Sequence, residues 1–422
     1  MAESGEVEKS ERPGVKEFLK PGHTIILLGT GGVGKTTIAA AIGLASAGLS
    51  RKTALITIDP ARRLREALGL RRLDDRPTRI DRRRLERAGL DPGLGLYAMV
   101  LDVKRQWDAL VERFIADPAA RKHILANRFY RSLAGQMAGS DAYAALEQLY
   151  DVHDSGRFEV AIVDTPPAAH AFEFIQAPGR IARLLESGPA RLFAAAPSLP
   201  GSRLALGLAS RAARFVIAEL ERFTGTEVLS SITDFFSSAA VATSALADRF
   251  RKAEAMLRSP TVHFIIVTTA EPDRLSHARE LIDELEREGL CAAAIIVNRF
   301  LDEEAWDAPA RDYRRPTAPM AELSAAADRD PELHAALDYL QSYQRGIEAA
   351  AIRVEQFARE LPDHIGLAAA PEIAIGVADL AALKSVATRL LGAAMPVAGA
   401  RGLATRPARG RPARARRKSK PE

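Results

Sequence analysis

Cysteine is almost absent from this chain, which has one such residue, Cys291, among 422. A lone cysteine excludes a disulfide framework within the chain, and it excludes any metal site that one subunit builds from paired cysteines. Disulfide bonds are typical of oxidising compartments, so their exclusion leads us to expect a reducing compartment, the cytoplasm.

Long apolar runs and a secretory signal are lacking as well. No uninterrupted apolar stretch reaches the roughly 18 residues that a membrane-spanning helix needs. The most apolar long region, residues 190–220, is broken by Arg203, Arg211 and Arg214. The first ten residues are acidic and polar, which is not the pattern of a secretory signal. We interpret residues 1–20 as a flexible leader.

The net charge of +5 hides an uneven distribution of basic residues. Residues 392–422 carry nine basic side chains and one acidic one, so this segment has a charge of +8 and the rest of the chain −3. The segment is rich in proline, alanine and arginine and cannot bury a core, which predicts a disordered basic tail. Such a tail either contacts nucleic acid, an anionic membrane or an acidic partner, or only keeps the chain soluble.

Short apolar runs that alternate with helical patterns dominate the remaining sequence. Apolar residues make up 47% of the chain, which suits one large α/β domain with a sizeable core. The pattern predicts one α/β domain over residues 21–391, with helical insertions at about 103–157 and 186–258 and a solvated helical connection at 62–87. The alternation favours a mostly parallel sheet flanked by helices. The expected strands lie at residues 24–28, 53–58, 96–101, 159–163, 262–268, 291–297 and 364–368.

Residues 29–36 read Gly-Thr-Gly-Gly-Val-Gly-Lys-Thr and match the phosphate-binding pattern G-x-x-x-x-G-K-[ST]. An apolar strand precedes the loop and a helix follows it, so a bound phosphate would lie at the helix N-terminus. Lys35 can reach the β- and γ-phosphates, and the hydroxyl of Thr36 can ligate Mg²⁺. We therefore predict that a nucleotide and Mg²⁺ bind here, through Gly29, Thr30, Gly31, Gly32, Val33, Gly34, Lys35, Thr36 and Thr37.

Polar residues stand at the ends of three further strands, where ligands of open α/β sheets bind. Asp164 suits the carboxylate that organises Mg²⁺, although aspartate also favours a helix N-cap. Asp59 can orient or deprotonate the attacking water. The amide of Asn298 suits the Watson–Crick edge of a purine. We predict Lys35 and Asp59 as catalytic residues, Thr36 and Asp164 as metal ligands, and Asn298 as the base contact.

These motifs resemble the ArsA-type ATPases, the family of the arsenical pump-driving ATPase and of the ATPases that target tail-anchored membrane proteins. The resemblance covers roughly residues 22–390, and three stretches look most like the bacterial ArsA-like branch. It implies a dimeric ATPase of the deviant Walker A class, with ATP at or near the subunit interface. The motifs that carry it are residues 29–37, 57–61, 164–170 and 297–299.

By position, the resemblance matches Asp59 to the family's switch I aspartate and Asp164 to its second-motif aspartate. Asn298 matches the adenine-contacting asparagine. His170 matches a histidine of the second switch, where a structural or switch contact is expected rather than a base.

Two features depart from the family pattern. Thr30 stands where the family has a lysine that reaches the partner's phosphates, so the options are slow hydrolysis, a heterodimer with a lysine-bearing paralogue, or a substitute arginine such as Arg62 or Arg63. The family's arsenite-binding thiols and its Cys-x-x-Cys zinc site need cysteines that this chain lacks. We expect neither a zinc site nor an arsenite thiol site.

The combined expectation is a Mg²⁺-dependent ATPase whose nucleotide state drives a conformational switch acting on a protein or membrane partner. One alternative is a low-turnover, nucleotide-sensing subunit of a heterodimer. Another is a ParA/MinD-like positioning ATPase whose basic tail contacts DNA or membrane. Residues 187–247 contain many large apolar side chains. These either form a groove for the helix of a membrane-protein client or pack onto each other.

Overall fold

The fold is described from a computed structural model that carries the protein chain alone. The described residues are 12–58, 62–91, 95–135, 140–187, 231, 234–235, 238–239, 242–301, 330–372 and 380–392.

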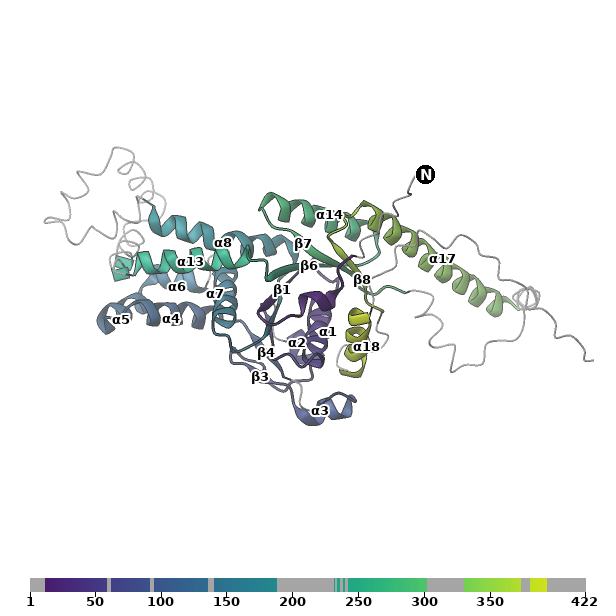
Figure 1. The fold of residues 1–422 in the computed structure, drawn as a ribbon, viewed down its shortest axis with the longest axis horizontal. Coiled ribbons are helices and arrows are strands. Elements are labelled where there is room, and N and C mark those ends of the chain that lie inside the picture. Colours follow the sequence, from purple (N-terminus) through teal and green to yellow (C-terminus); the bar gives the residue numbers. More distant parts are fainter. Residues whose placement is uncertain are drawn as a thin grey trace, which may run out of the picture.

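An eight-stranded sheet forms the centre of the molecule, with the strand order β3-β4-β2-β5-β1-β6-β7-β8 (Figure 1). Neighbouring strands pair in parallel, apart from β3 and β4, which are antiparallel. The predicted α/β fold with a mostly parallel sheet is therefore confirmed. The strands are β1 His23–Leu28, β2 Thr53–Thr57, β3 Thr78–Arg79, β4 Leu96–Val100, β5 Val160–Asp164, β6 Val262–Thr268, β7 Ala292–Val297 and β8 Gly366–Ala369.

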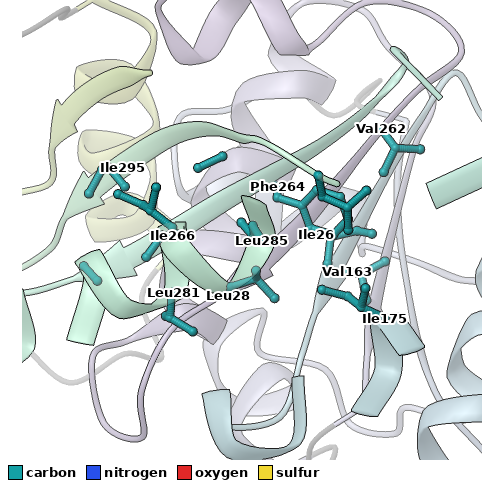
Figure 2. Packing of buried hydrophobic residues seen from close by; sticks show 14 of the residues in the cluster. Ile26, Leu28, Val163, Ile175, Val262, Phe264, Ile266, Leu281, Leu285 and Ile295 are labelled. Atoms are coloured by element: carbon teal, nitrogen blue, oxygen red, sulfur yellow. The ribbon is translucent and has the colours of Figure 1, made fainter. Parts of the chain in front are cut away.

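Successive side chains of a strand point to opposite faces of the sheet. Both sets are apolar here, so helices cover both faces. In β1, Ile26 and Leu28 belong to one buried cluster, whereas Ile25 and Leu27 belong to another. The first cluster packs against α7 Ser140–Asp154, α8 Ala168–Glu186, α14 Pro272–Arg287 and α17 Pro331–Glu360. Figure 2 shows its strand residues together with Ile175 of α8 and Leu281 and Leu285 of α14. The second packs against η1 Val15–Phe18, α1 Lys35–Gly48, α2 Arg62–Ala67, α3 Arg82–Arg87 and α18 Leu380–Gly392. Burial on both faces explains why the strands read as continuous apolar runs.

A separate layer of helices lies at one end of the sheet, on the left in Figure 1. Its own buried cluster includes Trp107, Tyr130 and Phe250. Besides α7 and α8, its members are α4 Val103–Phe114, α5 Pro118–Ala126, α6 Arg128–Gly135 and α13 Thr243–Leu257. Within the described residues, no helix is both long and apolar enough to cross a membrane. Most of the apolar stretch at 187–247 lies outside those residues, but Phe235 is described, and its ring lies 5.4 Å from that of Phe129.

Two segments differ from the sequence-based expectation. Residues 12–20 of the expected leader pack on the domain, where Val15 and Leu19 are buried and Arg12 donates to the carbonyl oxygens of Pro362 and Ile365. Val15, Phe18 and Leu19 stand at the helical positions i, i+3 and i+4, which places them on one face and explains this packing. Residues 1–11, like the tail residues 393–422, lie outside the described part of the chain.

The arginine-rich segment 62–87 is not a solvated helical connection. It contains two short helices and the edge strand β3. Leu64 and Leu85 are fully buried and Ile80 is nearly so. Arginines stand between these apolar residues, so the sequence shows no apolar run or regular period that would indicate burial. The segment is therefore part of the core edge, and the prediction for it was wrong.

Candidate functional site

The loop between β1 and α1, residues 29–34, is shaped by close packing against the neighbouring strands. Gly34 has a φ of +90°, and a Cβ atom there would lie 2.2 Å from Nδ2 of Asn298. Gly29 approaches β6 so closely that a Cβ atom would lie 2.3 Å from the carbonyl oxygen of Val267. Only glycine fits both positions, because any side chain would clash with backbone or with a buried amide. The loop leads into the N-terminus of α1, where backbone N–H groups favour an anion.

Lys35 is the first residue of α1 and is only 8% exposed. Its Nζ donates to the carbonyl oxygen of Gly29 over 2.8 Å and to that of Thr30 over 3.2 Å. An ammonium group has three donors and no acceptor, so these carbonyl groups hold it against the loop. A polyphosphate in the loop would meet this positive charge directly.

An oxygen cluster adjoins the loop on the β5 side. Asp164 ends β5 and is 1% exposed. Its Oδ2 accepts a hydrogen bond from Thr36 over 2.7 Å and another from Thr57 over 3.1 Å. The strand register explains the meeting, because Asp164 lies opposite both Leu27 of β1 and Thr57 of β2. Hydroxyl and carboxylate oxygens are the ligands that Mg²⁺ prefers, so this donor set fits a magnesium ion.

Asn298 adjoins the loop on the other side. It is 5% exposed, and its Nδ2 donates to the carbonyl oxygen of Val33 over 2.8 Å. Its backbone N–H donates to the carbonyl of Thr268 at the end of β6. The side chain thus ties the end of β7 to the phosphate loop. Contact with a purine base remains a prediction for this residue.

The first turn of α14 brings a second cation to the loop. Nη1 of Arg274 donates to Oγ1 of Thr30 over 2.7 Å. Burial disfavours ionisation of Glu271 in the same turn. Hydrogen bonds from the Thr269 side chain and from the backbone of Glu271 itself favour the ionised form, as do the charges of Arg274 and Arg299. Together they outweigh burial and lower the pKa of the Glu271 carboxyl. Sequence reasoning missed Arg274, because nothing in its local pattern separates it from other arginines on a charged helix.

A cavity of about 360 Å³ opens where β7 ends, between the sheet and α17. It begins next to Asn298, at Arg299, whose φ of 55° is uncommon for a residue other than glycine. The lining residues are Ala270, Arg299, Phe300, Leu301, Tyr339, Ser342, Tyr343, Gly346, Ile347 and Ala350.

The structure brings together most of the predicted site but not all of it. Asp59 lies outside the described residues, which resume at Arg62 after Ile58. The side chains of Arg62 and Arg63 are likewise not described, so their candidacy as substitute cations stays a prediction. Thr57 begins the motif at residues 57–61, but sequence reasoning gave it no role at the site, because a threonine inside an apolar strand reads as part of the strand.

Comparison with known proteins agrees with this geometry. Residues 23–192 match the model of the family described as anion-transporting ATPase. The chain is 25% identical over 303 residues to the ATPase ASNA1 homolog of Babesia bovis, covering 70% of this chain and 73% of the relative. It is 23% identical to ATPase GET3 of Malassezia globosa, covering 71% and 80%. A putative arsenical pump-driving ATPase 1 of Aquifex aeolicus is 26% identical over 159 residues, covering 36% and 37%.

Proposed function

We propose a function from one premise: the chain belongs to the ArsA/GET3 family of anion-transporting ATPases. It is accordingly an ATP-binding enzyme that hydrolyses the β–γ phosphoanhydride bond. The finer proposal is that ATP binding and hydrolysis switch the protein between two conformations that act differently on a protein or membrane partner. The Thr36–Asp164 hydrogen bond of 2.7 Å, beside the buried Lys35, carries the proposal.

The proposed roles follow from charge and position. Lys35 binds the β- and γ-phosphates, and the loop N–H groups surround them. Thr36 and Asp164 would hold Mg²⁺, which supplies positive charge to the phosphate oxygens when bound. Asp59 would orient the attacking water as it approaches the γ-phosphorus. Asn298 would direct the adenine base toward the end of β7.

The proposal includes two kinds of partner, a second subunit and a client protein. We propose a cytoplasmic dimer, either of two copies or with a lysine-bearing paralogue, and a membrane-protein client that binds the helical insertions. The separate helical layer beside the ATPase sheet supports the client site in this proposal. The basic tail is proposed to contact nucleic acid or an anionic membrane. A nucleotide sensor with little turnover, or a ParA/MinD-like positioning ATPase, would use the same loop with a different output.

The test is Lys35→Ala, assayed as Mg²⁺-dependent phosphate release and as ATP affinity. Removing the buried ammonium deletes a charge-assisted contact to phosphate, so we expect ATP to bind at least about 10-fold more weakly and turnover to fall to background. The matched control is Lys122→Ala, an exposed lysine of α5, which should leave both quantities unchanged. Wild-type affinity and turnover in Lys35→Ala would contradict the proposed function. ATP binding by the wild-type chain without turnover would instead favour the sensor.

A further inference from the structure

Thr30 is contacted by a cation on each side. Its carbonyl oxygen accepts from Lys35, and its hydroxyl accepts from Nη1 of Arg274 over 2.7 Å. Lysine at the position of Lys35 reaches the β- and γ-phosphates in phosphate loops. A single loop residue therefore contacts both that ammonium and the guanidinium of Arg274.

The backbone of α14 fixes Arg274 in this position. Its carbonyl oxygen accepts a 2.9 Å hydrogen bond from Oγ1 of Thr268, the last residue of β6. The next residue, Leu275, is buried in the core. Gly29 packs on the carbonyl of Val267, so the end of β6 lies directly against the loop. The side chain of Arg274 thus starts from a rigid element rather than from a free turn.

Arg279, five residues further along α14, shows what a structural arginine looks like in this helix. Its guanidinium pairs with the carboxylate of Glu360 at 2.5 Å and lies 5.0 Å from the ring centre of Phe357. Arg274 differs, because its side-chain hydrogen bond goes to a neutral hydroxyl. In the described part of the chain, Arg274 forms no ion pair within 4.0 Å. The carboxylate on which its charge acts is that of Glu271, three residues earlier, whose pKa it lowers together with Arg299. Its guanidinium is therefore near a carboxylate but not paired with it directly.

We propose that Arg274 is a further catalytic residue, a second cation of the phosphate loop that the Thr30 hydroxyl holds ready for the γ-phosphate of the same chain. This inference rests on the proposed function. Water attacks the γ-phosphorus, the bond to the β–γ bridging oxygen breaks, and ADP and inorganic phosphate leave. The guanidinium donates to the γ-phosphate oxygens, whose negative charge it stabilises as that bond breaks. Arginine suits this role, since its planar fork matches phosphate oxygens and stays charged.

The pair also changes the expected effect of placing lysine at Thr30. In the wild-type chain a new ammonium there would meet the guanidinium of Arg274, and two adjacent like charges repel. We therefore expect Thr30→Lys alone to raise turnover little. In an Arg274→Ala background the same substitution supplies the missing cation and should restore part of the lost rate.

The experiment compares ATP turnover with nucleotide affinity in a set of single and double variants. Arg274→Ala should lower kcat by about 10²-fold or more. It should weaken binding of the non-hydrolysable analogue AMP-PNP more than that of ADP, since ADP lacks the γ-phosphate. Arg274→Lys should retain part of the rate. Thr30→Val keeps the shape of the side chain but loses the hydroxyl, and its kcat should lie between that of Arg274→Lys and that of the wild type. Arg279→Ala is the matched control and should keep kcat and the AMP-PNP to ADP affinity ratio.

Two outcomes would overturn the inference. One is a wild-type kcat and affinity ratio in Arg274→Ala. The other is an equal loss of ADP and AMP-PNP binding together with a lowered melting temperature, which would show that the arginine only supports the fold.

Mixing Arg274→Ala with Lys35→Ala tests whether the arginine serves its own chain. Recovered turnover in the mixture would mean that it acts across a dimer, which would overturn the placement proposed above. If the wild-type chain binds AMP-PNP but releases no phosphate, the proposed function fails while the affinity ratio still tests Arg274.

Discussion

Asn298 offers a prediction that separates two roles of one side chain. Its amide donates to the carbonyl oxygen of Val33, and Asn298→Ala removes this donor. The carbonyl is then left in the narrow space beside Gly34. An unsatisfied buried acceptor costs about 1–3 kcal/mol of folding free energy. We expect about 1–2 kcal/mol, since water can reach part of a loop that opens to the surface.

The nucleotide-free protein is the first assay, because it contains no base to contact. Urea unfolding should give the stability order wild type, then Asn298→Ala, then Asn298→Asp. The aspartate keeps the size of the side chain but turns acceptor oxygens toward the Val33 carbonyl, which repels them. If the residue also contacts adenine, the preference for ATP over GTP should fall roughly 10-fold in the alanine variant, the equivalent of one lost hydrogen bond.

Asn127 provides the matched control, since its Nδ2 also donates to a backbone carbonyl, that of Ser231, over 2.9 Å. Asn127→Ala should lower stability in the helical layer but leave nucleotide selectivity unchanged. Unchanged nucleotide-free stability in both Asn298 variants would refute the anchoring role. An unchanged ATP to GTP ratio would refute the base contact.

Three further predictions follow from buried charges and from the switch I position. Arg249→Ala removes the guanidinium 2.6 Å from the carboxylate of Glu147, whose side chain is 1% exposed, and leaves Arg113 at 3.6 Å as its partner, so the cost in urea unfolding should be about 3 kcal/mol. Arg251→Ala, at a half-exposed ion pair, should change stability by less than about 1 kcal/mol. Burial above all lowers the pKa of His263 to about 4. The unfolded chain therefore takes up the proton first, and stability should fall by about 1–2 kcal/mol from pH 7 to pH 5. His263→Gln should reduce this loss, and the part that remains belongs to His23, whose pKa burial also lowers. Asp59→Asn should keep Mg·ATP affinity but lose most phosphate release, because the amide is not a base, and wild-type turnover would exclude Asp59 from the mechanism.

The sheet and the phosphate loop were predictable because their signals are local. An apolar run that is buried on both faces needs no partner to be recognised, and the spacing of the loop glycines and Lys35 lies within eight residues. The order of the strands was not predictable from these runs. Yet Asp164 and Asn298 could be chosen as site candidates, since every parallel strand ends at the same edge of the sheet.

Features that depend on tertiary contacts escaped the sequence. Arg274 and Thr30 are 244 residues apart, and only the pairing of β1 with β6 brings them together. β3 has two residues, too few to show a period of two. Thr57 looks like a strand residue until the register places it opposite Asp164. In each case the missing information is which strands are neighbours, which a single sequence does not contain.

The central place of β1 gives the loop an electrical polarity. On its β5 side stands the carboxylate of Asp164, and on its β6 side the guanidinium of Arg274. A cation is favoured on the first side and an anion on the second. An arginine of α17, Arg353, donates to the carbonyl oxygen of Ala270, which lies between β6 and α14, four residues before Arg274. A force on Arg274 from the γ-phosphate would therefore be exerted on the start of α14. That part of the helix is bonded to β6 through Thr268, and it follows the segment that Arg353 of α17 contacts. Loss of the phosphate would release the force. The cation that replaces the lysine at Thr30 is thus also the residue through which the nucleotide state could reach a helix outside the loop.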